Sequence, residues 1–228
     1  MNSLTVLTVT LHNEELVTQL IKSFQKFKPK DLNINYIIVE NSDNISYKDQ
    51  VCSLDTNLTW LQNPLQPKIV PGGGWAHGRA LNLGIENTKD DWVFICDSDT
   101  LVVSSNFFNE LFLKVNQGYD LIGVSYDPHP NRIGAVHPSG LLVKTSIASK
   151  VNMIPVPEKN WDTANEITVY VKEHDLKFYV FRNTWNDETL VDLIDSPYNE
   201  WGADGIDRCL DSENNIMFLH LGRGSAKS

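Results

Sequence analysis

Residues 91–100 read DWVFICDSDT, an apolar run that ends in two aspartates separated by one serine. Every position from Trp92 to Cys96 is apolar, which is typical of a central strand buried on both faces of a sheet. Asp97 and Asp99 follow directly, and open α/β sheets bind their ligands just beyond the carboxyl ends of their strands. The stretch therefore predicts a buried strand that carries two carboxylates to a ligand-binding edge.

Strand and helix patterns alternate along the chain before this run. Leu4–Leu11 alternates apolar residues with threonine, and Glu14–Phe27 repeats its apolar residues at helical spacing. Ile34–Val39 and Leu58–Leu61 have the composition of strands, and Trp75–Glu86 is expected to be a helix. Strands that alternate with helices indicate an α/β fold with a largely parallel sheet covered on both faces.

Beyond Asp99 the pattern continues. Helices are expected at Asn106–Asn116 and Trp161–His174, and from Asp204 through Leu210. Strands are expected at Leu121–Val124, Leu141–Val143, Lys177–Phe181 and Ile216–Leu219. Because the sequence contains no internal repeat and no low-complexity linker, we expect a single domain over residues 1–228, with a soft division into two halves near Asp99.

Composition excludes several classes of protein. A chain of 228 residues that is 41% hydrophobic can bury the core of one α/β domain, and its net charge of -10, without a basic run, makes nucleic acid a poor partner. Cys52, Cys96 and Cys209 are far apart and odd in number, which fits a reducing, cytoplasmic setting. No apolar stretch approaches the roughly 20 residues of a membrane span, so we expect at most peripheral membrane contact.

Asp97 and Asp99 have two interpretations. Residues two apart in an extended chain point to the same side, so the carboxylates can face one site, where they repel each other unless a cation neutralises them. Mg²⁺ or Mn²⁺ suits such a pair, because each takes few protein carboxylates and completes its shell with water and phosphate oxygens. A solvated turn is the alternative, since Asp-Ser-Asp is also good turn chemistry. The triplet alone leaves the two interpretations equal.

Several blocks of the sequence together resemble family 2 glycosyltransferases. In the first half these blocks are Leu4–Glu15 (LTVLTVTLHNEE), Tyr36–Asp43 (YIIVENSD), Gly72–Asn87 (GGGWAHGRALNLGIEN) and Asp91–Thr100 (DWVFICDSDT). Further on, Glu200–Arg208 (EWGADGIDR) resembles the Trp-Gly-x-acid block of family 2 and of related galactosyltransferases, and Phe218–Ser225 (FLHLGRGS) resembles the closing histidine segment. The Asp-x-Asp block is the most specific part of the resemblance.

The resemblance implies a GT-A fold, which is Rossmann-like, and transfer of a sugar from a nucleoside diphosphate, with UDP expected, to an acceptor hydroxyl, with inversion. It implies Mn²⁺ or Mg²⁺ as cofactor. Residues 1–100 would bind the nucleotide sugar and residues 101–228 the acceptor. The acceptor itself is left open among a glycan, a lipid-linked sugar, a protein and a small molecule.

The resemblance also gives roles to residues at the ends of the first two strands. Thr10 and Glu40 would contact the base or the ribose, and the family usually carries Asp where this chain has Glu40. Asn13 would belong to the same pocket, although a helix N-cap explains it equally well. Trp75 and His77 are interpreted as packing and loop residues rather than ligands.

Arg79 and Arg223 are the candidate contacts to the diphosphate. Arg79 lies in the glycine-rich block, and an ordinary exposed helix arginine is the alternative. Arg223 lies in a basic tail that could fold over the diphosphate when the donor binds. A dinucleotide-binding fingerprint or the phosphate loop of a sugar nucleotidyltransferase would follow the first strand, where this chain instead has His12 and Asn13.

Asp97, Asp99 and His220 form the expected metal set, with Asp97 also counted among the donor-binding residues. A neutral imidazole suits a third ligand, and a structural histidine is the alternative. Asp204 is the expected general base, and a helix N-cap is its alternative role. Asp207, three residues later, is the next candidate for the base. The rival functions are sugar nucleotidyl transfer and non-catalytic binding of a nucleotide sugar.

Overall fold

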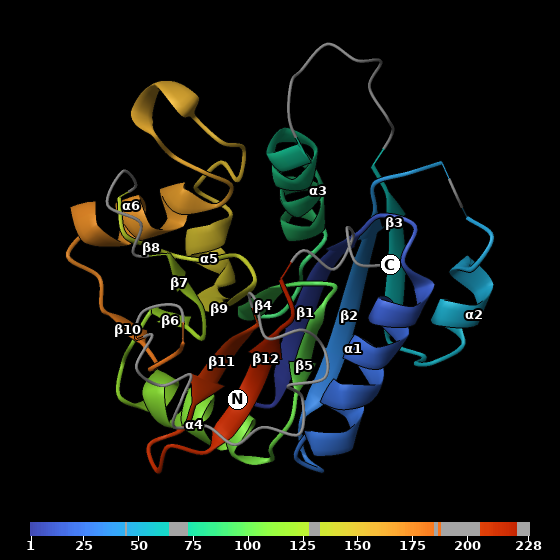
Figure 1. Ribbon diagram of the computed structural model, residues 1–228, viewed down its shortest axis with the longest axis horizontal. Helices are drawn as coiled ribbons and strands as arrows, with labels where there is room; N and C mark the ends of the chain where they lie inside the picture. The colour runs from blue at the N-terminus through green and yellow to red at the C-terminus, as the bar shows by residue number, and fades with distance from the viewer. Residues whose placement is uncertain (44, 64–72, 128–132, 185–186, 188–205, 223–228) are drawn as a thin grey trace.

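The computed structural model describes residues 1–43, 45–63, 73–127, 133–184, 187 and 206–222 (Figure 1). At its centre lies a seven-stranded sheet, whose strands in spatial order are β10 (Phe178–Val180), β6 (Leu121–Gly123), β9 (Gly140–Lys144), β4 (Trp92–Asp97), β1 (Ser3–Thr10), β2 (Asn33–Glu40) and β3 (Leu58–Gln62). Neighbouring strands are parallel, except that β9 is antiparallel to both β4 and β6. The predicted α/β fold with a mostly parallel sheet is confirmed.

Helices cover both faces of this sheet (Figure 1). They are α1 (Glu14–Phe27), α2 (Lys48–Cys52), α3 (Gly73–Glu86), α4 (Asn106–Asn116), α5 (Thr145–Ala148) and α6 (Asn165–Glu173). Phe94 and Cys96 of β4 pack into one core with α1 and α4, whereas Val93 and Ile95 pack into the other with α3, α5 and α6. The apolar run is therefore buried on both faces, as the sequence predicts.

Helix α1 illustrates how local sequence and packing agree. The side chain of Asn13 accepts a hydrogen bond from the backbone N–H of Leu16 at 3.2 Å, which caps the first turn. Its buried residues recur at helical spacing, and Phe24 packs edge-on against Phe107 with ring centroids 5.8 Å apart. Burial of this apolar stripe fixes α1 against the sheet and so fixes the end of β1, where Asn13 stands.

A second, three-stranded sheet brings the C-terminal part of the chain back to β4 (Figure 1). It consists of β11 (Asp207–Leu210), β12 (Ile216–His220) and β5 (Thr100–Val102), all antiparallel. Because β5 begins three residues after β4 ends, the pairing of β12 with β5 places the end of β12 beside the end of β4.

Two predicted helices need correction. Residues 207–210 form a strand rather than part of a helix, because all four side chains are buried and the strand pairs with β12, to which residues 211–215 connect it. Helix α6 begins at Asn165 rather than Trp161, because Trp161 and Val156 exchange backbone hydrogen bonds in an isolated bridge. The sequence patterns also missed α2, α5, β5, β7 (Tyr126–Asp127) and β8 (Ala135–Val136), which are all short.

Candidate functional site

The carboxyl edge of the central sheet gathers the polar ends of three adjacent strands. Glu40 ends β2, Thr10 ends β1 and Asp97 ends β4. In the parallel register Thr10 lies beside Glu40 and Val9 beside Asp97, so the three polar residues share one edge. This is the edge at which open α/β sheets bind ligands.

Asp97, Asp99 and His220 converge at this edge. The Nε2 atom of His220 lies 3.4 Å from Oδ2 of Asp97 and 3.5 Å from Oδ1 of Asp99. One ligand atom from each residue lies within 4.8 Å of the others. Asp99 and His220 are buried, whereas 23% of the Asp97 side chain is exposed, so the cluster is open to the outside through Asp97.

Strand register explains why a residue near the end of the chain reaches the Asp-Ser-Asp turn. His220 pairs with Thr100 across β12 and β5, and the backbone N–H of Leu221 donates to the carbonyl oxygen of Asp99 at 3.0 Å. The turn itself is closed by the hydroxyl of Thr100, which donates to the carbonyl oxygen of Asp97 at 2.8 Å. The turn and the strand pairing together hold the three side chains in place.

The cluster has a strongly negative potential. Burial opposes the charged form of His220, but the hydrogen bond to Asp99 and the charges of Asp99, Asp97 and Asp207 outweigh it and raise the pKa of His220 to about 9. Asp207 pairs with His220 in the strand register, and its carboxylate accepts hydrogen bonds from the hydroxyls of Ser125 at 2.9 Å and Thr184 at 3.1 Å. A site that stabilises positive charge on an imidazole also attracts a divalent cation.

His77 is a neighbour of the cluster that sequence reasoning missed. It lies on α3 with 24% of its side chain exposed, and its Nε2 is 3.6 Å from Oδ1 of Asp97. A helix that follows a strand of a parallel sheet runs back across the sheet, so its first turns begin at the carboxyl edge. The position of His77 near the start of the helix between β3 and β4 could have indicated from the sequence that it lies near Asp97.

Glu40 and Asn13, two of the predicted nucleotide-binding residues, have hydrogen-bond partners within the fold. Glu40 is fully buried, and its carboxylate accepts hydrogen bonds from the Tyr47 hydroxyl and, at 3.4 Å, from the backbone N–H of His12. Burial, followed by the hydrogen bond to Glu40, raises the pKa of Tyr47. Thr10 is also buried, and Asn13 caps α1. Roles of these three predicted residues in nucleotide binding stay predictions.

Of the three remaining predicted residues, one lies apart from the convergent cluster and two lie outside the described residues. Arg79 is half-buried on α3, with its guanidinium carbon 4.9 Å from the centre of the Trp75 ring. Its predicted contact with a phosphate stays a prediction. Asp204 and Arg223 lie outside the described residues, so their predicted roles as base and diphosphate contact are not tested.

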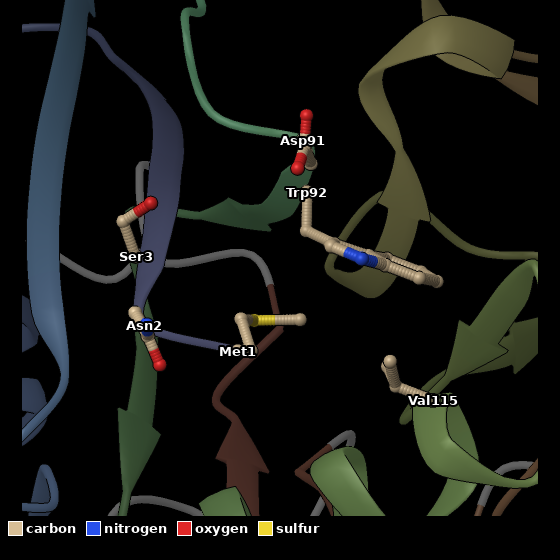
Figure 2. A pocket seen from close by; sticks show the side chains of 6 residues that line it. All are labelled: Met1, Asn2, Ser3, Asp91, Trp92 and Val115. Carbon is tan, nitrogen blue, oxygen red and sulfur yellow. The ribbon is translucent and has the colours of Figure 1, made fainter.

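A pocket of about 340 Å³ lies at the opposite edge of the sheet, where β1 and β4 begin. Figure 2 shows the ring of Trp92 above the side chains of Met1 and Val115 in this pocket. Asn2, Ser3 and Asp91 complete the lining. None of these residues belongs to the Asp97–Asp99–His220 cluster, so the pocket and the cluster are separate features.

Within the part of the chain that the structure describes, no helix is both long enough and apolar enough to span a bilayer.

The fold has many relatives among solved structures. The mannosyltransferase PcManGT from Pyrobaculum calidifontis, in complex with GDP-Man and Mn²⁺, aligns with a TM-score of 0.59 and 13% identity, over 78% of this chain and 54% of that one. TarS from S. aureus gives a TM-score of 0.55 and 14% identity, over 78% of this chain and 35% of that one.

Glucosyl-3-phosphoglycerate synthase from Mycobacterium tuberculosis, in complex with Mn²⁺, UDP-glucose and phosphoglyceric acid, gives a TM-score of 0.54 and 14% identity, over 78% of this chain and 69% of that one. At such identities the likeness shows the GT-A fold. The chain spans about half the length of PcManGT and about a third of TarS.

Comparison of the sequence itself gives the family. No curated protein matches the chain. The family model described as glycosyl transferase family 2 matches residues 5–154, which include most of β1, all of β2, β3 and β4, and the Asp97–Asp99 turn. With its fold and this match, the chain belongs to glycosyl transferase family 2.

Proposed function

We propose that this protein transfers a sugar from a nucleoside diphosphate sugar to an acceptor hydroxyl, with a divalent cation held by Asp97, Asp99 and His220. One observation carries the proposal: the ligand atoms of these three side chains lie within 4.8 Å of one another at the carboxyl edge of the sheet. Asp97 connects the cluster to solvent, as a site that receives a diphosphate requires.

The donor set fits the cation. Two carboxylates with one imidazole suit Mn²⁺ or Mg²⁺, which leave the remaining coordination positions to water and phosphate oxygens. The same negative charge that raises the pKa of His220 to about 9 favours a cation between the three side chains. When bound, the cation supplies Lewis-acid stabilisation of the charge that develops on the departing diphosphate.

The donor is proposed to be a nucleotide sugar bound mainly by residues 1–100 of a single domain, with UDP as the nucleotide. Support comes from the family and from related folds solved with GDP-Man and Mn²⁺, with UDP-GlcNAc, and with UDP-glucose and Mn²⁺. Thr10 and Glu40 end β1 and β2 at the edge where Asp97 ends β4, and Asn13 follows β1 as the cap of α1; the base or ribose would lie there. Arg79 and Arg223 are the proposed contacts to the diphosphate.

The acceptor is proposed to bind to residues 101–228. Asp204, on the resemblance of its sequence block, would take the proton of the acceptor hydroxyl as its oxygen bonds to the anomeric carbon and the bond to the diphosphate breaks, which inverts the configuration. Asp207 is less suited to this role, because its oxygens already accept hydrogen bonds from Ser125 and Thr184. The three cysteines are free thiols, which suits the proposed cytoplasmic setting.

Phosphorus NMR separates this function from its rivals. Wild-type protein is incubated with UDP-glucose, UDP-GlcNAc or GDP-mannose, with Mn²⁺ or with EDTA, and the products are identified. Release of nucleoside diphosphate that requires the cation supports sugar transfer, with water replacing the unknown acceptor. Formation of nucleoside triphosphate and sugar phosphate after addition of pyrophosphate identifies a nucleotidyltransferase. Binding without consumption identifies a non-catalytic module.

A further inference from the structure

The two oxygens of the Asp97 carboxylate face two different imidazole rings. Oδ2 lies 3.4 Å from Nε2 of His220, on the side of the metal cluster. Oδ1 lies 3.6 Å from Nε2 of His77, which comes from α3. The distance to His77 is slightly longer than a hydrogen bond, and the contact is attractive when Nε2 carries the proton of the ring.

We propose that His77 is a positioning residue that holds Oδ1 of Asp97 and thereby presents Oδ2 to the cation. The inference rests on the proposed function. Carboxylates that bind a metal are commonly oriented by a hydrogen bond to their other oxygen, and loss of that partner weakens metal binding or activity about 10- to 100-fold. His77 can supply such a bond as a neutral ring, because a proton on Nε2 is sufficient.

His77 is not itself a member of the convergent set. Among the described residues, the group whose ligand atoms lie within 4.8 Å of one another comprises Asp97, Asp99 and His220. The contact of His77 is with Oδ1 of Asp97, whereas that of His220 is with Oδ2. His77 therefore contacts the proposed ligand Asp97 without being one of the proposed ligands.

The backbone on each side of His77 is fixed, as a positioning role requires. On one side, the carbonyl oxygen of Ala76 accepts a hydrogen bond from Nδ2 of Asn63, just after β3, at 3.3 Å. On the other side, Gly78 packs directly on the main chain of Met153, where an added Cβ would lie 2.5 Å from the carbonyl oxygen. These two anchors hold the start of α3, and with it the imidazole, against the end of β4.

Mn²⁺ binding, measured by electron paramagnetic resonance, tests the proposal without any substrate. We expect His77→Ala to weaken Mn²⁺ binding about 10- to 100-fold. We expect His77→Gln, whose amide retains an N–H at similar reach, to recover most of that loss. His174→Ala is the matched control: His174 is an exposed histidine that directly follows α6 and contacts Tyr170, and its removal should leave Mn²⁺ affinity unchanged.

Pulsed measurements of nitrogen coupling to Mn²⁺ distinguish positioning from direct ligation. A positioning role leaves the number of coordinated histidine nitrogens the same in wild type and in His77→Ala. Loss of one coordinated nitrogen in His77→Ala would make His77 a ligand and overturn the proposal, as would equal Mn²⁺ affinity in the two proteins. Should His77→Ala melt far below wild type, His77→Phe, which keeps a ring but has no N–H, takes its place in the same comparison.

The outcome for His77 is separable from the outcome for the proposed function. Wild-type protein that binds Mn²⁺ but consumes no nucleotide sugar would contradict sugar transfer, while the His77 comparison would still decide the positioning role. Wild-type protein that does not bind Mn²⁺ would overturn both.

Discussion

Glu40 ends β2 and Asp97 ends β4, on either side of β1, yet their carboxylates have different surroundings. The Glu40 carboxylate is fully buried and accepts hydrogen bonds from the Tyr47 hydroxyl and the His12 backbone. The Asp97 carboxylate is partly exposed and lies between the imidazoles of His77 and His220. A tyrosine hydroxyl and a backbone N–H donate to the Glu40 carboxylate, whereas two histidine rings flank the Asp97 carboxylate.

The surroundings of an acidic residue at a strand end therefore indicate whether it supports the fold or binds a ligand. Hydroxyl and amide donors satisfy the oxygens of a single buried carboxylate, which then needs no cation as a partner. Two neighbouring carboxylates, Asp97 and Asp99, repel each other, and the cost of that repulsion falls when a cation binds. We therefore expect variants at the Glu40 corner to change stability, and variants at the Asp97 corner to change metal binding.

The largest expected effect is that of Asp99→Asn. The amide keeps the size of the buried side chain but removes a charged ligand, so we expect sugar transfer to fall by roughly 10²- to 10³-fold, with weaker Mn²⁺ binding. In the metal-free protein the change relieves repulsion from Asp97 but also removes a charge that stabilises the His220 imidazolium, so calorimetry should show a folded variant with a modestly lower melting temperature. Retention of wild-type turnover would remove the metal role of this turn.

Gly78→Ala should affect the Asp97 corner through α3. The added Cβ would lie 2.5 Å from the carbonyl oxygen of Met153, a backbone atom that cannot turn aside. We expect a stability loss of about 1–3 kcal/mol in urea denaturation, together with weaker Mn²⁺ binding as His77 moves. Gly118→Ala, at a glycine with φ of +82° where an added Cβ would meet no atom within 4 Å, controls for glycine removal that leaves α3 in place. Equal Mn²⁺ affinity in a destabilised Gly78→Ala would argue against the positioning role of His77.

Tyr47→Phe should affect the Glu40 corner alone. The ring and its edge-on packing with Trp60 remain, but the buried Glu40 carboxylate loses its hydroxyl donor. The expected cost is about 1–3 kcal/mol in the free energy of unfolding, measured in urea. Mn²⁺ affinity should equal that of wild type. A variant of unchanged stability with weakened Mn²⁺ binding would reverse the contrast between the two corners.

Sequence alone predicted much of this arrangement, for physical reasons. The unbroken apolar run before Asp97 identified the central strand, because a strand buried on both faces is apolar at every position. Helical spacing identified α1, α3 and α4, and the end of β12 pointed to His220. Local pattern could not predict which strands pair. Residues 207–210 were predicted as helical, but they pair with β12, and β12 in turn pairs with β5 more than a hundred residues earlier.

The environments of individual side chains were equally beyond local pattern. Burial of Glu40 depends on Tyr47, which precedes a helix of five residues that no periodicity could identify. The contact of His77 with Asp97 depends on the rotation of α3, which Gly78 fixes through its contact with Met153. Both are decided by packing between segments distant in sequence, so the residue types were visible but their partners were not.

The smallest expected effect concerns Asn13, which caps α1 and is also a proposed contact to the nucleotide. Its side chain accepts the backbone N–H of Leu16, so Asn13→Ala should cost about 1 kcal/mol in the free energy of unfolding. Asn13→Asp retains the cap, and its charge is favourable at a helix N-terminus, so its stability should match or slightly exceed that of wild type. A residue that only caps leaves UDP affinity unchanged in the Asp variant. A residue that contacts the nucleotide lowers that affinity, because the new carboxylate repels the diphosphate. Isothermal titration with UDP and Mn²⁺ on the two variants decides between these roles. We expect Asn13→Asp to lower UDP affinity at unchanged stability, because the proposed donor pocket includes Asn13 in addition to its cap of α1.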